Sequence, residues 1–245
     1  MPEEGCEWGC FDYSQQEPRL VVHYAATTEP ICFDDSVGNI VNKFKDNSVD
    51  FHQTVADMAD IPRSQAKTIN LGLFYGMGKT KLQAELGVTK EKAADLFNTY
   101  HAKVPFVKQL MDKASNRAQD RGQIRTLLGR LCRFHLWEPN SFGMHKALPF
   151  DQAVQEHGPG IKRAYTYKAL NKLIQGSAAD MTKKAMINLH KEGIIPHIQV
   201  HDELDISVED PAHAEKIKQI MESAVDLEVP NKVDYESGPN WGQIK

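Results

Sequence analysis

The chain has 245 residues, of which 41% are hydrophobic and 25% are charged, so it can form one or two packed domains and is not a disordered chain. No apolar run is long enough to cross a membrane and the acidic N-terminus has no signal peptide, which predicts a cytoplasmic protein. The net charge of −4 is unevenly distributed: −9 over residues 1–60, +9 over 61–135 and −4 over 136–245. This pattern indicates a phosphate-binding lobe beside a metal-binding one, or else a solvated basic face on an ordinary helical domain.

The N-terminal part is predicted to contain a strand followed by helices. Residues 10–14 end the strand, and Pro18 suits the first turn of the next helix, where its missing N–H is not needed. Residues 36–59 are predicted as short helices. A further helix covers residues 63–75 and is ended by the glycines that follow it.

The middle of the chain is predicted to be mostly helical. Residues 79–121 place apolar side chains at helical spacing, and residues 122–137 resemble a hairpin or extended turn. Residues 138–160 are rich in loop formers. A long helix is then predicted over residues 161–191, with an irregularity at Gly176.

The clearest strand signal lies between residues 195 and 208. Apolar and polar residues alternate on both sides of His201-Asp202-Glu203, which predicts a hairpin with its tight turn at this charged trio. An amphipathic helix is predicted over residues 211–226.

Two aspartates far apart in the sequence are candidates for one metal site. Asp12 ends the first strand and Asp202 lies at the tip of the hairpin. A strand end and a hairpin tip in one antiparallel sheet can bring two carboxylates together, and a divalent cation would relieve their repulsion. Two Mg²⁺ ions held in this way can clamp the attacking and leaving oxygens of a phosphoryl transfer. Taken singly, each aspartate has a simpler explanation, Asp12 as a helix cap and Asp202 as a turn residue.

The helix over residues 63–75 carries a stripe of four residues spaced four apart: Arg63, Lys67, Leu71 and Tyr75. Successive members of such a stripe are rotated by only ~40° around the helix, so they project to one side. A guanidinium and an ammonium group near a helix N-terminus can bind a triphosphate, and a tyrosine ring can stack on a base. The alternative is a surface helix with two solvated cations and a buried tyrosine.

The four cysteines are expected to be reduced thiols. Cys6, Cys10, Cys32 and Cys132 form neither a paired zinc pattern nor an even disulfide ladder. A metal role for Cys6 and Cys10 is the weaker alternative, because two thiols do not complete a tetrahedral site.

Taken in order, four segments of the chain resemble the family A DNA polymerases. Asp-Tyr-Ser-Gln-x-Glu-x-Arg, from Asp12 to Arg19, is similar to motif A of that family, and the segment from Arg63 to Gly76 is similar to motif B. Gln-Val-His-Asp-Glu, from Gln199 to Glu203, is similar to motif C. The segment from Asn171 to Asp180 also matches, so the resemblance covers nearly the whole chain.

The resemblance implies a two-metal nucleotidyl transfer. Asp12 and Asp202 would hold two Mg²⁺ ions, for which Mn²⁺ is a possible substitute, with the Tyr13 backbone carbonyl as a further ligand. Glu203 would be an accessory carboxylate. The incoming triphosphate would be bound by Arg63, Lys67 and His52, with Lys67 also donating a proton to pyrophosphate. Taken alone, His52 is better explained as a packed or solvated histidine.

Further residues match the family's nucleotide and DNA contacts. Glu17 matches a steric gate that excludes a ribose 2′-hydroxyl, Gln15 belongs to the same active-site segment, and Tyr75 would lie beside the templating base. The residues expected to bind primer–template DNA are Arg19, Asn171, Gln175 and His201. Gln175 is otherwise explained as a helix surface residue.

The sequence departs from the family pattern at two positions. Leu71 stands where the family usually has Phe or Tyr, and we expect it to alter incorporation rate and sugar selectivity without abolishing chemistry. Tyr167 or Lys168 stands where a family arginine is expected just before Asn171, which puts that DNA contact in doubt.

The resemblance implies an α+β fold: an antiparallel palm sheet with helices, and mostly helical fingers. Residues 1–60 and 161–245 are predicted to form the palm and residues 61–160 the fingers, with the thumb and exonuclease domains absent. We therefore expect the C-terminal half of a split polymerase, acting on dNTPs and DNA with an N-terminal chain that supplies the thumb and the remaining palm. It resembles phage-type members, so the host cytoplasm is its expected location.

Two alternatives remain open on the sequence. The chain could be a non-catalytic, DNA-binding remnant of such a polymerase. Alternatively, it could be related to the single-chain RNA polymerases, which share the two aspartates and the basic helix. Glu17 and the His-Asp-Glu form of motif C favour DNA.

Overall fold

The computed structural model describes residues 1–28, 35–45, 50–59, 61–74, 77–141, 143 and 145–244. The chain divides into two compact units: unit 1 comprises Met1–Thr27, Val37–Ser48 and Ser177–Lys245, and unit 2 comprises Thr28–Ser36 and Val49–Gly176. The divisions predicted from the sequence fall after residues 60 and 160. No helix among the described residues is long and apolar enough to cross a membrane.

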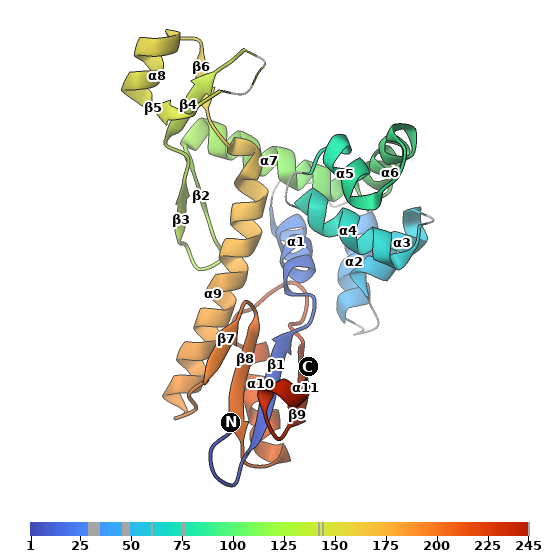
Figure 1. The fold of residues 1–245 in the computed structure, drawn as a ribbon, viewed down its shortest axis with the longest axis vertical. Helices are drawn as coiled ribbons and strands as arrows, with labels where there is room; N and C mark the ends of the chain where they lie inside the picture. Colours follow the sequence, from blue (N-terminus) through green and yellow to red (C-terminus); the bar gives the residue numbers. More distant parts are fainter. Residues whose placement is uncertain are drawn as a thin grey trace. The chain divides into compact units, whose positions relative to one another are not determined.

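Unit 1 is built on one sheet with helices beside it (Figure 1). Its elements are β1 (Glu7–Tyr13), α1 (Gln16–Thr27), most of α2 (Asp35–Lys45), β7 (Ile198–Val200), β8 (Glu203–Val208), α10 (Pro211–Glu222), β9 (Val233–Gly238) and α11 (Trp241–Ile244).

Unit 2 is mostly helical and includes two small sheets. Its elements are α3 (Phe51–Ala59), α4 (Arg63–Phe74), α5 (Lys79–Leu86), α6 (Lys90–Lys103), α7 (Pro105–Arg121), β2 (Gln123–Arg125), β3 (Leu131–Arg133), β4 (Leu136–Pro139), β5 (Leu148–Pro149), α8 (Phe150–His157), β6 (Ile161–Arg163) and the short helix η1 (Thr166–Lys168). The long helix α9 (Ala169–Lys191) belongs to unit 2 up to Gly176 and to unit 1 from Ser177. The structure thus has the predicted mixture of helices and antiparallel sheet.

The sheet of unit 1 has the strand order β7-β8-β1-β9, and all of its pairs are antiparallel. Because side chains alternate between the two faces of a strand, one face carries Phe11, Leu204 and Ile206, which are buried. Helix α10 packs on β8 and β9 and contributes Ile217 to this core. Asp12 of β1 and Glu203 and Asp205 of β8 point to the other face.

The predicted hairpin is confirmed, and its turn is tight. Val200 pairs with Glu203, so the loop between β7 and β8 consists of His201 and Asp202 alone. His201 has φ +53°, in the left-handed region that non-glycine residues seldom adopt. The structure therefore holds Asp202 at the hairpin tip, where the alternation placed it.

Strand β6 and helix α9 correct the prediction of one helix over residues 161–191. Residues 161–163 instead pair with β4, and the Arg163 guanidinium lies over the Trp137 ring, 4.5 Å from its centroid. This pairing joins segments distant in sequence, so local periodicity does not reveal it.

The irregularity predicted at Gly176 is also wrong, because α9 continues through that residue. A Cβ atom there would lie 2.6 Å from the Thr126 side chain, and Arg130 donates a hydrogen bond of 2.6 Å to the Gly176 carbonyl. Close packing between the β2–β3 hairpin and α9 therefore explains the glycine.

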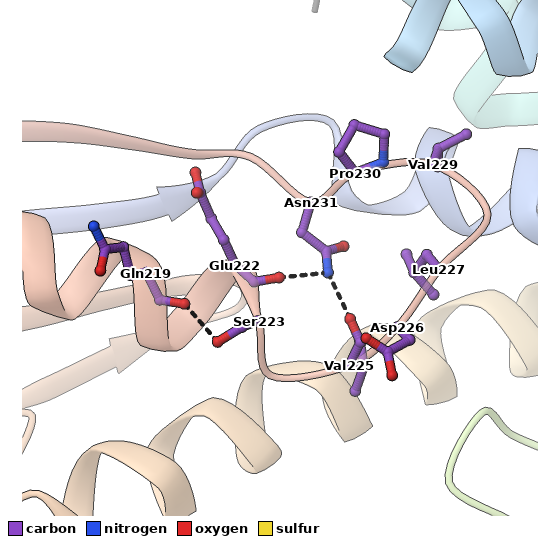
Figure 2. Close-up of a pocket in the computed structure, with 9 residues that line it drawn as sticks. All are labelled: Gln219, Glu222, Ser223, Val225, Asp226, Leu227, Val229, Pro230 and Asn231. Atoms are coloured by element: carbon purple, nitrogen blue, oxygen red, sulfur yellow. Dashed lines mark hydrogen bonds between the residues drawn. The ribbon is translucent and has the colours of Figure 1, made fainter.

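The segment between α10 and β9 surrounds a surface hollow, which Figure 2 shows. Within it, the Asn231 side chain donates hydrogen bonds of 2.9 Å to the carbonyls of Glu222 and Val225. These bonds hold the segment that leads the chain into β9. No predicted site residue lines the hollow.

Candidate active site

Three carboxylates stand in register at one end of the unit 1 sheet. Asp12, near the end of the central strand β1, pairs with Glu203 of β8 on one side and Asp234 of β9 on the other. Directly opposite residues in antiparallel strands have Cβ atoms about 5 Å apart on the same face. Asp12 is exposed and Glu203 is half-buried, so both carboxylates lie near solvent. Backbone pairing therefore gathers like charges where an external cation can reach them.

Asp202 follows directly in the turn and is half-buried. Burial raises its pKa, the neighbouring Glu203 carboxylate raises it further, and a backbone hydrogen bond and His201 oppose the shift. The rise means that the charged form of Asp202 is poorly stabilised by the protein alone. A bound cation would supply the missing stabilisation.

Asp234 is a carboxylate of this end of the sheet that was not predicted from the sequence. Burial acts to raise its pKa, but hydrogen bonds from Lys232 and Ser14 outweigh burial, so the pKa is lowered. The Lys232 ammonium lies 2.8 Å from the Asp234 carboxylate. Asp234 thus has a cationic partner within the protein, which distinguishes it from Asp202.

One triplet of potential metal ligands converges among the described residues, with its ligand atoms within 4.8 Å of one another: Cys10, Glu203 and Asp205. It shares Glu203 with the predicted site but contains neither Asp12 nor Asp202. Cys10 pairs with Asp205 across β1 and β8, two residues further from the hairpin turn than Asp12 and Glu203 and therefore on the same face. The sequence pattern suggested a partner for Cys10 only in Cys6, because the register that joins Cys10 to Asp205 is a long-range feature.

The turn after β1 leads the remaining motif A residues into α1. Gln15 has φ +53°, and Glu17 lies half-exposed in the first turn of α1. The Tyr13 side chain is buried and its hydroxyl donates a hydrogen bond of 2.6 Å to the Met221 carbonyl. These contacts fix the backbone at Tyr13, whose carbonyl was the predicted further metal ligand.

Arg19 is buried rather than available for DNA. Its side chain is 3% exposed, donates hydrogen bonds to the Ser14 and Pro230 carbonyls, and lies over the Phe44 ring. Burial lowers its pKa, although nearby carboxylates oppose this shift. The guanidinium therefore stabilises the turn after β1, and we do not propose a direct contact with DNA.

In unit 2, Arg63 at the start of α4 forms an ion pair with Asp50. The Arg63 Nε atom lies 2.5 Å from Asp50 Oδ2, and Asp50 Oδ1 accepts hydrogen bonds from the backbone N–H groups of His52 and Gln53. Asp50 thus caps α3 with one carboxylate oxygen and binds Arg63 with the other. Burial acts to raise the Asp50 pKa, but these hydrogen bonds and the Arg63 charge outweigh it and lower the pKa.

His52 lies beside the same cations. Its side chain is 7% exposed, and the Asn70 amide lies 3.0 Å from its Nδ1 atom. As placed, this amide donates the hydrogen bond, so Nδ1 accepts and a neutral ring carries its proton on Nε2. Burial lowers the His52 pKa, Arg63 and Lys67 lower it further, and Asp50 opposes them. The predicted phosphate ligands Arg63, Lys67 and His52 are therefore electrostatically coupled.

The rest of the α4 stripe is only partly described. Lys67 is exposed and Leu71 is half-exposed, whereas Tyr75 lies outside the described residues. A Cβ atom on Gly72 would lie 1.4 Å from the end of the Met77 side chain and 3.3 Å from its Cβ. Gly72, which lies within the motif B segment, is therefore in close contact with the Met77 side chain.

The remaining predicted DNA contacts are accessible. Asn171 and Gln175 lie four residues apart on α9, half-exposed and exposed respectively, so they share one face of the helix. His201 is exposed at the hairpin tip, and Gln199 donates a hydrogen bond of 3.0 Å to its carbonyl. Asn171 and Gln175 in unit 2 and His201 in unit 1 therefore all have polar groups that reach solvent.

This fold, with its carboxylates on a three-strand register and its cations on a helix, is that of a polymerase domain. The chain belongs to DNA polymerase family A, whose sequence model matches residues 1–243. It is 35% identical over 99% of its length to a DNA-directed DNA polymerase of Pseudomonas phage M6, and 33% identical over 98% to DNA polymerase I of Geobacillus stearothermophilus.

A solved structure supports the same assignment. The POL domain of Pol1 from M. smegmatis, in complex with DNA primer-template and dNTP, matches 99% of this chain with a TM-score of 0.77 and 27% identity. This chain covers 41% of that protein, and 39% and 26% of the phage and Geobacillus relatives. It therefore spans well under half of each of these proteins.

Proposed function

We propose that the chain carries the active site of a template-directed DNA polymerase, which joins a dNTP to a primer 3′-hydroxyl. The observation that carries this proposal is the placement of Asp12, Asp202 and Glu203 at one end of the unit 1 sheet. In the reaction, the primer 3′-oxygen forms a bond to the α-phosphorus, the bond from that phosphorus to the bridging oxygen breaks, and pyrophosphate leaves.

Asp12 and Asp202 would hold two Mg²⁺ ions, with the Tyr13 carbonyl as a further ligand and Glu203 as an accessory carboxylate. The residues fit these ions, because carboxylate and carbonyl oxygens are the ligands that Mg²⁺ prefers and the Asp202 carboxylate is poorly stabilised without a cation. Mn²⁺ suits the same oxygen ligands. Bound there, the ions would neutralise charge on the reacting phosphate and activate the 3′-oxygen.

Arg63, Lys67 and His52 would bind the triphosphate, and Lys67 would donate the proton that pyrophosphate takes as it leaves. On binding the nucleotide, Arg63 would leave the Asp50 carboxylate and bind a phosphate oxygen, which is also negatively charged. Its other guanidinium N–H groups can add hydrogen bonds to the same phosphate. When its Nδ1 atom accepts from the Asn70 amide, a neutral His52 can donate one hydrogen bond from Nε2 without becoming charged.

Glu17 and Leu71 would select the sugar, and Gln15 and Tyr75 would complete the nucleotide site. Removal of the Glu17 side chain should admit ribonucleotides, since a steric gate works by excluding the 2′-hydroxyl. Leu71→Phe should change the rate and the discrimination against dideoxynucleotides. Unchanged sugar choice in Glu17→Ala, or unchanged rate and discrimination in Leu71→Phe, would count against these roles.

Unit 1 would serve as the palm and unit 2 as the fingers, whose closure would bring Arg63 and Lys67 onto the triphosphate. Asn171, Gln175 and His201 would contact the primer–template. The basic block of residues 61–135 suits contacts to DNA phosphates.

We also propose that a second polymerase chain completes the enzyme. Strand β7 is an edge of the sheet among the described residues, and such an edge can accept a further strand. Ile187 and Ile195 of unit 1 are 53% and 66% exposed, which would suit an apolar partner surface.

Primer extension tests both proposals. The chain is incubated with Mg²⁺, primer–template and four dNTPs, alone and with a candidate N-terminal polymerase chain. Extension that is lost on Asp202→Ala supports the polymerase, and extension that needs the second chain supports the partner. Efficient extension by the chain alone would refute the partner requirement. Binding to DNA without extension in either arm would favour a non-catalytic remnant.

A further inference from the structure

We propose that Cys10, Glu203 and Asp205 form a separate metal site that takes a Zn²⁺-like transition-metal ion. The site lies on the same face of the unit 1 sheet as Asp12 and Glu203, two residue pairs further from the hairpin turn. The ligand atoms of the three residues lie within 4.8 Å of one another. Binding can be measured without nucleotide or DNA, so this inference stands independently of the proposed polymerase activity.

The backbone fixes two of the three ligands. Cys10 and Asp205 are paired residues of β1 and β8, so their side chains lie side by side on one face. The third ligand, Glu203, lies two residues before Asp205 on β8, which returns it to the same face. Glu203 is half-buried, and its carboxylate lies within 4.8 Å of the other two ligand atoms.

Asp205 gives an independent reason to expect a ligand. Its side chain is 0% exposed, and its Oδ2 atom has no hydrogen-bond partner among the described residues. Its Oδ1 atom accepts one long hydrogen bond, of 3.4 Å, from the Trp8 indole N–H. A buried carboxylate oxygen is normally paired or bound to a metal, because burial without a partner is unfavourable.

The surroundings of Asp205 resemble the second layer of a metal site. The Trp8 ring stacks on His197, with ring centroids 5.5 Å apart, and His197 lies 2.7 Å from the Ser207 hydroxyl. The Trp8 N–H therefore orients the carboxylate, and the stacked rings limit the movement of Trp8. Such outer contacts are typical of residues that hold a metal ligand in place.

The donor set favours zinc over magnesium. A thiolate with two carboxylates suits a borderline-soft ion, whereas Mg²⁺ requires a shell of oxygen ligands. Ligand atoms around a tetrahedral Zn²⁺ stand roughly 3.5 Å apart, so the triplet must contract by about 1 Å on binding. Three protein ligands and one water would complete the ion, and the Cys10 thiol would release its proton to solvent on binding.

Glu203 links this site to the catalytic carboxylates. When it binds the transition metal, it is drawn away from Asp12 and Asp202, so Zn²⁺ would oppose the Mg²⁺-dependent reaction.

Co²⁺ is the probe for the test, because a cobalt–thiolate bond gives a strong near-ultraviolet charge-transfer absorption that carboxylates do not give. The reduced full chain is titrated with Co²⁺, and Zn²⁺ is then added to displace it. We expect the absorption to appear, to be lost in Cys10→Ser, and to need at least about tenfold more Co²⁺ in Asp205→Asn. Trp8→Phe, which lacks the indole N–H, should weaken binding by a similar factor or less.

Matched controls separate the proposed site from other thiols and from the catalytic site. Cys6→Ser and Cys132→Ser should keep the absorption, and so should Asp202→Asn, which removes a predicted Mg²⁺ ligand. No absorption in the unaltered chain, or absorption that survives Cys10→Ser, would overturn the proposal. Circular dichroism verifies folding, and if Asp205→Asn does not fold, the Cys10→Ser result alone decides. Primer extension that fails while the absorption behaves as expected would refute the polymerase activity and leave the metal site standing.

Discussion

The sheet of unit 1 and the helix pair of unit 2, which consists of α3 and α4, position charged side chains by different means. In the sheet, backbone pairing holds Asp12 beside Glu203, so two carboxylates of like charge are kept close even though they repel one another. In α3 and α4, side-chain contacts hold the charges, and Arg63 is neutralised by Asp50. The sheet site is therefore expected to depend on an external cation, whereas the helix site already holds an anion that the triphosphate must replace.

The largest expected effect is at the sheet. Asp202→Asn keeps the size of the side chain but removes its charge, and we expect primer extension in the complete enzyme to fall by roughly 10³-fold, because a lost metal ligand costs several kcal/mol of transition-state stabilisation. Steady-state extension assays measure this change. The matched control is Asp226→Asn, an exposed aspartate of the same unit, which should remain within about twofold of the original rate. If extension by Asp202→Asn falls by less than tenfold, the sheet site does not depend on a bound cation as this contrast with the helix site requires.

A smaller effect is expected at the helix pair. Arg63→Ala removes a charged donor, and we expect the KM for dNTP to rise by about 10- to 100-fold, since hydrogen bonds to charged groups contribute about 1.5–3 kcal/mol. Lys81→Ala removes an exposed cation from α5 in the same unit and serves as the control. If both variants raise KM equally, net charge and not the position of Arg63 determines nucleotide binding.

Asp50→Asn sharpens the comparison, because it removes the anion that Arg63 binds in the free protein. Asparagine is as good a helix cap as aspartate, so α3 should remain folded. We expect the KM for dNTP to fall by about two- to fivefold, since an exposed ion pair is worth up to about 1 kcal/mol. An increase in KM would instead show that Asp50 positions Arg63 for the phosphate, and that the pair acts as one unit.

The sequence was most informative where chemistry and local pattern coincide. The hairpin around Asp202 was predictable because alternation on both strands leaves only a two-residue turn for the charged residues. The helix that carries Arg63 and Lys67 was predictable from its spacing and from the glycines after it. In both cases the signal lies within about fifteen residues of chain, which is the range that periodicity can report.

The features that were missed depend on contacts between distant segments. Strand β9 brings Asp234 beside Asp12, but its apolar–polar alternation is short, and its place beside β1 depends on long-range pairing. The match of Cys10 with Asp205 depends on the same long-range register. The burial of Arg19 under Phe44 and beside Pro230 is likewise tertiary, so its motif alone suggested a DNA contact. The sequence thus predicted which side chains carry the chemistry better than it predicted which residues those side chains contact.

The smallest expected effect is the titration of His52, which reports on the helix pair directly. Its folded pKa is lowered below 6.5, so the folded protein favours the neutral ring. The stability contributed by this preference is present above the unfolded pKa and is lost as pH falls through the folded pKa. The melting temperature should therefore decrease below pH 6.5, and it should decrease less in His52→Gln. Part of this pH dependence will remain in that variant, because burial also lowers the pKa values of His23 and His101.

Histidine NMR titration separates His52 from the others and tests how its neighbours act. Lys67→Ala should raise the His52 midpoint because it removes a cation, and Asp50→Asn should lower it because it removes an anion. His23, whose pKa depends on burial and on Glu228, gives an internal control whose midpoint should be the same in both variants. Opposite shifts in the two variants would establish that the helix pair sets its own electrostatics through side chains. If neither variant moves the His52 midpoint, burial alone sets its pKa, and the contrast between a backbone-held sheet site and a side-chain-held helix site would lose its electrostatic basis.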